Sequence, residues 1–362
     1  MKLIPRPPGA RKKSLKARQV AGGTGGSGSD PSGKTKSSVT HGYFKTFDGT
    51  KLFYSIEGKG KPLIFCYGLV CSSLHWTYQI DHFKENYQTI WFDYRGHQNS
   101  EAPVDLDSLT LENLAKDIAC LMDELKLKDA VFLGHSMGVN VVLELYRQHP
   151  ERVAGMILAN GTSTRPLDTL FHVNALQAGF DLLRRANDRS PKLVSFLWNL
   201  QKNNPLARTM VALAGFNPHL TPAEDIQTYV NQVADMDPAI LIHLIKSYEN
   251  YDATHWLHMI NVPTLIIAGE NDNVIPLRQQ ELMHQLIPNS QLSVIKHGSH
   301  CPQMDLPELV NHKIQNHLNE MGYAAALRPP ETHAKLKPVP AAGSKAPGRS
   351  KSVREREVSP KK

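Results

Sequence analysis

A single serine lies between glycines where an apolar segment meets a helical pattern. Residues 130–138 read AVFLGHSMG, and the letters VNVVLELYRQH follow them. This is G-x-S-x-G in the strand–turn–helix context that a nucleophile elbow requires. Glycines two positions before and after the serine leave room for the strained turn that lifts a hydroxyl from a sheet edge. The pattern predicts Ser136 as a nucleophile.

A serine hydroxyl needs a base, and the base needs an acid that orients it. On folds with this elbow the chain order is Ser, then Asp or Glu, then His. Asp272 and Glu270 both follow the predicted strand PTLIIAG, whereas His300 and His297 both follow QLSVIK. Loops at the carboxyl ends of strands hold the ligand sites of open α/β sheets. We favour Asp272 over Glu270 as the acid, and His300 over His297 as the base because His297 still adjoins its strand.

Acyl transfer also needs backbone N–H donors for the developing oxyanion. One donor is expected from Met137, the residue after the nucleophile. The other is expected from the loop after residues 62–67, where Gly68 permits a tight approach and Leu69 is the predicted donor.

The other reactive side chains are interpreted as structural. No base accompanies Cys66, Cys71 or Cys301, and four cysteines in a chain of this size suggest no disulfide framework. His297 and His300 lack companions at ligand spacing, so we expect no metal. Residues 28–35 match G-x-x-x-x-G-K-[ST], but neither a buried strand nor a helix flanks them, so no nucleotide site is expected.

Short apolar runs alternate with helical patterns through the middle of the chain. A hairpin is predicted around Asp48-Gly49, with strands at 43–47 and 51–56. Further strands are predicted at 62–67, 89–93, 130–134, 155–159, 263–269 and 291–296, and helices at 111–125 and 137–148. This order indicates an α/β fold with a mostly parallel, doubly wound sheet. Residues 162–250 read as helices without strands, which predicts a helical cap inserted after the sixth strand.

Charge divides the chain into a body and two tails. Residues 1–38 hold nine Lys/Arg and one acid, and residues 323–362 hold ten Lys/Arg and three acids, so the tails carry +15. Residues 39–322 then carry 22 − 30 = −8. The tails are expected to be disordered arms, with weak attraction to anionic lipid or nucleic acid as the alternative. The α/β core is expected at 39–161 and 251–322, with the cap at 162–250.

The location of the protein is constrained by what the sequence lacks. The longest apolar runs are about half of the ~20 residues that a bilayer crossing needs. The N-terminus has no apolar core of a secretory signal. We expect a cytoplasmic protein; the alternative is an organelle reached through the basic N-terminal segment.

The chain from Gly42 to about Gly322 resembles the α/β-hydrolase superfamily, and within it the capped serine hydrolases. The matching segments are PLIFCYGLVCSSLHW, IWFDYRGHQNS, LGHSMGVNVVLELYRQHPERVAGMILAN, VPTLIIAGENDNVIP and HGSHCP. The resemblance implies an acyl-enzyme on Ser136, with His300 as base then acid and Asp272 as its orienter. It also implies an oxyanion hole at Leu69 and Met137, and no cofactor.

Two features depart from the family pattern. Tyr67-Gly68 stands where His-Gly is usual, and residues 95–100 read RGHQNS where R-G-x-G-x-S is common, so Gln98 replaces a glycine. Members that open epoxides or remove halogens carry an aspartate at the nucleophile position, so Ser136 argues against those reactions.

Apolar residues of the insertion are expected mainly to pack the cap, with a minority lining an acyl pocket. They are Phe171, Phe180, Leu182, Leu183, Phe196, Leu197, Trp198, Met210, Phe216 and Met236. The expected substrate is a small, partly apolar ester, thioester or lactone. The alternatives are acyl transfer, carbon–carbon or amide hydrolysis by the same triad, or a non-catalytic ligand-binding role.

Overall fold

A computed structural model describes residues 39–165, 176–201, 204–248 and 250–324. The expected tails therefore lie outside the described residues, apart from Tyr323 and Ala324. Within the described ranges, no helix is long and apolar enough to cross a bilayer.

Eight strands form one sheet in the order β1-β2-β4-β3-β5-β6-β7-β8. They are β1 (Thr40–Lys45), β2 (Lys51–Glu57), β3 (Pro62–Cys66), β4 (Gln88–Phe92), β5 (Ala130–His135), β6 (Val153–Ala159), β7 (Thr264–Gly269) and β8 (Ser290–Ile295). β2 pairs antiparallel with β1 and with β4, and every other pair is parallel. The predicted mostly parallel α/β sheet is confirmed.

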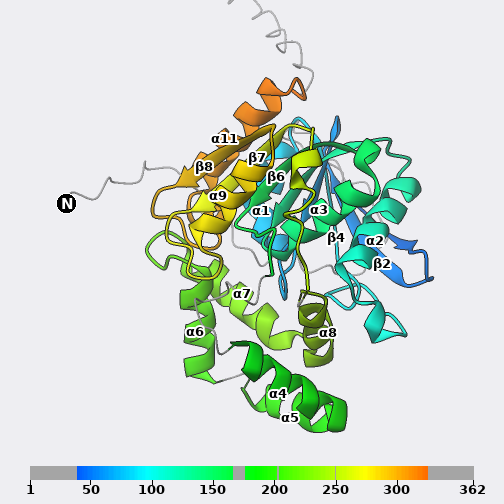
Figure 1. The fold of residues 1–362 in the computed structure, drawn as a ribbon, viewed down its shortest axis with the longest axis vertical. Coiled ribbons are helices and arrows are strands. Elements are labelled where there is room, and N and C mark those ends of the chain that lie inside the picture. The colour runs from blue at the N-terminus through cyan, green and yellow to red at the C-terminus, as the bar shows by residue number, and fades with distance from the viewer. Residues whose placement is uncertain (1–38, 166–175, 202–203, 249, 325–362) are drawn as a thin grey trace, which may run out of the picture. The chain divides into compact units, whose positions relative to one another are not determined.

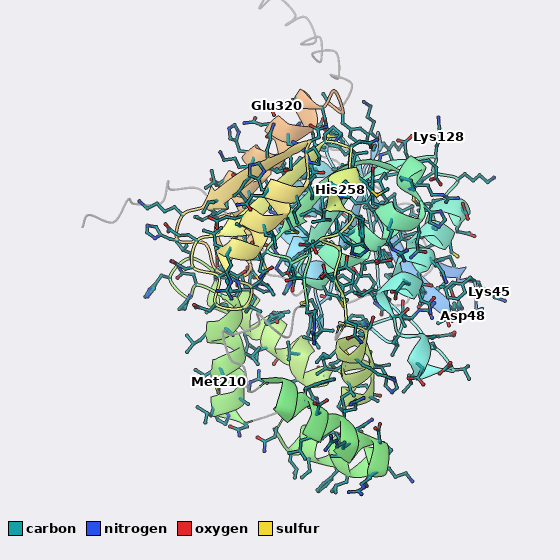
Figure 2. All side chains as sticks on the ribbon, viewed as in Figure 1. Lys45, Asp48, Lys128, Met210, His258 and Glu320 are labelled. Carbon is teal, nitrogen blue, oxygen red and sulfur yellow. The ribbon has the colours of Figure 1, made fainter. Side chains whose placement is uncertain are left out.

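The first strand differs from its prediction. It begins at Thr40 rather than Tyr43 and ends at Lys45 rather than Phe47. The chain turns earlier because the Thr46 N–H donates to the Thr50 carbonyl at 3.0 Å and Asp48 accepts from the Thr46 hydroxyl at 2.6 Å. Figure 2 labels Lys45 and Asp48 at this hairpin.

Helices connect the parallel strands and cover the sheet. They are α1 (Thr77–Phe83), α2 (Leu111–Glu124), α3 (Met137–Gln148), α9 (Leu277–Leu286), α10 (Pro302–Asp305) and α11 (Pro307–Glu320), with short 3₁₀ helices at Ser73–Trp76, Leu106–Ser108, Pro150–Arg152 and Leu257–Met259. α2 packs against α3, and α1 packs against α11. All residues of β5 and β7 are buried, as expected for strands covered on both faces.

Five helices lie between β6 and β7. They are α4 (Leu176–Arg189), α5 (Pro191–Gln201), α6 (Pro205–Gly215), α7 (Ala223–Asp235) and α8 (Pro238–Tyr248), drawn in green in Figure 1. We call them the α4–α8 segment. Three of the helices begin at a proline (Pro191, Pro205 and Pro238), where the missing N–H costs no hydrogen bond.

Candidate active site

The turn that carries Ser136 is strained and closely packed. Ser136 has φ 54° and ψ −120°, immediately before α3, and its N–H donates to the Ala159 carbonyl at 3.0 Å. A Cβ on Gly134 would lie 2.7 Å from the Gly138 carbonyl oxygen, and one on Gly138 would collide with the Cys66 carbonyl. Only glycine fits at both positions, so β5, β3 and α3 approach closely enough to fix the serine.

Asp272 and His300 meet across the ends of β7 and β8. The His300 Nδ1 lies 2.9 Å from the Asp272 Oδ2, and both residues are buried. The other carboxylate oxygen, Oδ1, accepts from the backbone N–H of Val274 at 2.7 Å and of Ile275 at 2.9 Å. These donors hold the carboxylate in place beside the imidazole, whose Nδ1 faces Asp272.

The rival residues form a pair of their own. The Glu270 Oε2 accepts from the His297 N–H at 2.9 Å and lies 3.7 Å from the His297 Nδ1. Both side chains are exposed. Geometry therefore separates this exposed pair from the buried pair of Asp272 and His300.

Asn160 is a site residue that the sequence reasoning missed. It follows β6 with φ 48°, and its Nδ2 donates to the Asp272 Oδ2 at 2.6 Å and to the Ser299 carbonyl at 3.2 Å. Its Oδ1 accepts from the Gly269 N–H at 3.2 Å. One amide thus links the ends of three strands. The sequence offers only a faint signal, an asparagine directly after a buried strand, where the left-handed conformation favours Asn.

The loop after β3 approaches the serine. A Cβ on Gly68 would lie 2.9 Å from the Ser136 Cβ and 3.3 Å from the His135 Nδ1. Leu69 follows it, and Val70 then adopts φ 55°. Met137 is the first residue of α3, so its N–H has no acceptor within the helix.

Two buried histidines lie beside this site, and the sequence analysis assigned them no role. The His135 Nε2 lies 2.8 Å from the His300 carbonyl oxygen and acts as its donor, while its Nδ1 faces the His75 Nδ1 at 3.4 Å. Burial lowers the pKa of His75 to about 3, with a further contribution from His300, and lowers that of His135 well below its usual value. Both imidazoles are therefore neutral at ordinary pH.

All four cysteines are free thiols. Burial raises the pKa of Cys66 to about 12 and also raises the pKa values of Cys71 and Cys301 above their usual range. His75, His135 and Cys301 offer ligand atoms within 4.8 Å of one another, the one such trio among the described residues. The two rings of this cluster contact each other through their Nδ1 atoms at 3.4 Å.

The α4–α8 segment reaches the site through α6 and α7. Phe216, which follows α6, packs with Cys301 and Met304, and the Tyr229 ring of α7 lies 4.9 Å from that of His75. Most of the apolar residues considered for a pocket lie elsewhere. Phe180 packs in a separate cluster and Phe171 is outside the described residues, while four others are exposed: Leu182, Phe196, Leu197 and Met210.

Among the residues that the structure describes, no hydrogen bond joins the Ser136 hydroxyl to His300. Such contacts are often long without substrate. The site therefore combines a strained serine, a histidine–carboxylate pair and a loop packed against the serine.

Comparison with known proteins agrees with this architecture. Residues 61–307 match the protein-family model that is described as "alpha/beta hydrolase fold". The chain is 27% identical over 293 residues to Epoxide hydrolase 4 of Mus musculus, covering 78% of this chain and 80% of that protein. It is 27% identical over 255 residues to 3-oxoadipate enol-lactonase 2 of Acinetobacter baylyi, covering 70% and 86%. A thermophilic esterase from Thermogutta terrifontis has a TM-score of 0.65 at 23% identity, covering 78% and 99%, and shows the likeness of fold.

Proposed function

Because this chain belongs to the family with the alpha/beta hydrolase fold, we propose that it is a serine hydrolase that cleaves a carboxylic ester, thioester or lactone. Ser136 is the nucleophile, His300 the general base and then acid, and Asp272 the residue that orients His300. The observation that carries the proposal is the buried 2.9 Å contact between the His300 Nδ1 and the Asp272 Oδ2. The preceding neighbour of Ser136, His135, also contacts His300, because its Nε2 lies 2.8 Å from the His300 carbonyl oxygen.

In the first step, substrate binding brings the Ser136 Oγ within hydrogen-bond reach of the His300 Nε2. The Oγ attacks the acyl carbon while Nε2 takes the hydroxyl proton, and the leaving alcohol or thiol receives that proton as its bond to the acyl group breaks. Water then attacks the acyl-enzyme, with His300 again taking and returning a proton. Acid is released and Ser136 is regenerated.

The backbone N–H groups of Leu69 and Met137 bind the oxyanion in this proposal. Met137 lies at the N-terminus of α3, where the helix dipole also favours negative charge. The close approach of Gly68 to Ser136 supports the placement of Leu69, because it brings the loop after β3 against the nucleophile.

Tyr67 departs from the usual histidine without disturbing this loop. Its hydroxyl accepts from the Tyr94 N–H at 2.9 Å, and its carbonyl accepts from the Tyr94 hydroxyl at 3.2 Å. These two bonds, both donated by Tyr94, tie the end of β3 to the residues after β4. Tyr67 therefore serves as a structural anchor.

The α4–α8 segment is the cap of this hydrolase, and Phe216 and Tyr229 form its contact with the site. Their aromatic rings favour a partly apolar acyl group. The similarity to an enol-lactonase supports a lactone or ester. The chain is also similar to an epoxide hydrolase, but epoxide opening uses an aspartate as the nucleophile. Because Ser136 stands at that position here, we favour ester-type hydrolysis over epoxide opening.

Hydrolysis of p-nitrophenyl esters from acetyl to palmitoyl tests the proposal. Wild type and Ser163→Ala should both turn over, because Ser163 is a buried serine whose hydroxyl has no partner among the described residues. Ser136→Ala should lose at least about 10³-fold in kcat/KM. Equal turnover by Ser136→Ala and wild type would overturn it.

A further inference from the structure

An apolar stripe on α5 faces solvent. Four of its large apolar side chains are 50–59% exposed: Leu193, Phe196, Leu197 and Leu200. Their spacing of i, i+3, i+4 and i+7 places them on one face of the helix, the pattern that ordinarily faces a core. Here the core contact is made from another position, since Val194 is the residue that packs with Phe180 and Ile242. Among the residues that the structure describes, the stripe is therefore an apolar face without a packing partner.

Helix α4, which packs against α5, and helix α6 also expose apolar side chains. On α6, Leu206, Met210 and Leu213 are 56–70% exposed and again lie at i, i+4 and i+7, and on α4 Leu182 is exposed. Figure 2 labels Met210 on α6. We call these eight side chains of α4, α5 and α6 the apolar surface. Exposed apolar groups gathered in this way mark a binding surface in a folded protein.

Positive charge accompanies the apolar surface. Residues 176–215 hold six Lys/Arg and two Asp, a net charge of +4. The rest of 39–322 holds sixteen Lys/Arg and twenty-eight acids, a net charge of −12. Arg185 and Arg189 of α4 and Lys192 of α5 are exposed on the helices that carry apolar residues. Residues 176–215 thus carry a net positive charge, whereas the rest of residues 39–322 is net negative.

We propose that the apolar surface docks on an anionic lipid bilayer. Leu and Phe side chains would enter the interfacial region while Arg185, Arg189 and Lys192 meet the phosphates, the arrangement by which amphipathic helices lie on membranes. A second copy of the chain is the less suitable occupant, because two surfaces of +4 would repel each other. An anionic bilayer satisfies both the apolar and the charged groups.

Docking in this way would place the bilayer against the segment that also contacts the candidate active site. The same segment contacts the His75 and Cys301 region through Tyr229 and Phe216. A ligand leaving the lipid layer would therefore meet the segment that contacts His75 and Cys301. The docking itself does not depend on the proposed chemistry, so Ser136→Ala should bind vesicles as wild type does.

Sedimentation of the full-length chain with vesicles tests the proposal. The vesicles are equal parts of phosphatidylcholine and phosphatidylserine, at rising salt. The double variant Phe196→Ser with Leu200→Ser should partition at least about tenfold more weakly than wild type. A matched variant, Val104→Ser with Met259→Ser, removes two exposed apolar residues outside the α4–α8 segment and should partition as wild type does.

The basic tails attract the same vesicles, so a local probe is also needed. An environment-sensitive fluorophore at Leu200→Cys, in a Cys120→Ala background, should shift to the blue on vesicle addition and be quenched by nitroxide lipids. The same fluorophore at Val104→Cys should do neither. Sedimentation without a response at position 200 would show binding by the tails alone and overturn the proposal. The proposal would also be overturned if the double variant bound vesicles as wild type does. The same holds if the only effect of the two substitutions were to dissociate an oligomer that forms without lipid.

Discussion

Asn160 shows how one amide can align a candidate site. It binds Asp272, the Ser299 carbonyl and the Gly269 N–H, which belong to the regions following β7 and β8 and to β7 itself. The carboxylate thereby accepts hydrogen bonds on both oxygens and keeps its position toward His300. We infer that Asn160 is a positioning residue, because it acts on Asp272 rather than on the substrate.

Asn160→Ala should lower kcat/KM about tenfold, the effect of losing one hydrogen bond to a charged group. Asn140→Ala is the matched control, since that buried amide donates to the Thr162 carbonyl at 2.8 Å and does not contact Asp272. Ester turnover and urea unfolding would be measured for both variants. A loss of stability in Asn160→Ala with unchanged turnover would contradict the positioning role.

The buried histidines predict how stability depends on pH. In the folded chain His75 has a pKa of about 3, whereas the ordinary pKa of histidine is 6.5. Below pH 6.5 the unfolded chain therefore binds a proton at His75 that the folded chain does not. The free energy of unfolding should therefore fall as the pH falls through 6.5. The contribution of His75 is about 2 kcal/mol by about pH 5.

His75→Phe should flatten this part of the pH dependence, because phenylalanine binds no proton. The exposed His258, changed to Phe as a control, should leave it as in wild type. Urea unfolding at pH 7 and at about pH 5 would measure both. Parallel pH dependences for wild type and His75→Phe would contradict the assignment of a neutral buried His75.

At the scale of elements, the site depends on how closely α3 approaches β3. Gly138→Ala would place a methyl group against the backbone of Cys66, and backbone cannot move aside as a flexible side chain does. The free energy of unfolding should fall by about 1–3 kcal/mol. Gly179→Ala on α4 is the control: it meets nothing within 4 Å and should be neutral or stabilising by up to about 1 kcal/mol. Equal unfolding midpoints in urea for Gly138→Ala and wild type would refute the close-packing argument.

Elements also explain which parts the sequence could predict. Buried parallel strands have a clear apolar pattern, so the sequence predicts the bounds of β3 to β8 to within two residues. The sequence also points to residues after the carboxyl ends of these strands, such as Asp272 and His300, as candidate site residues. The contacts of Asn160 and His75 join elements that are distant in the sequence. Such contacts leave at most a faint local pattern, as at Asn160. Phe196 and Leu197 were expected to pack the cap or line a pocket, and the sequence could not show that they are exposed.

At the scale of the whole molecule, charge is divided between body and ends. Residues 1–38 and 323–362 carry +15 and residues 39–322 carry −8. Retention of the full chain on an anionic support should weaken steeply with salt, because screening weakens attraction between exposed charges. A chain lacking both ends should be retained far less. Retention that is insensitive to salt, or unchanged after removal of both ends, would contradict this account.

The central claim is that Ser136 forms the acyl-enzyme, and covalent trapping tests it most directly. The full chain would be incubated with a fluorophosphonate, digested and analysed by mass spectrometry, with His300→Ala and Ser163→Ala in parallel. We predict one adduct per chain, on Ser136, at the same rate in Ser163→Ala and at least about 10³-fold more slowly in His300→Ala. An unmodified Ser136 in folded protein, or equal labelling in His300→Ala, would contradict the account.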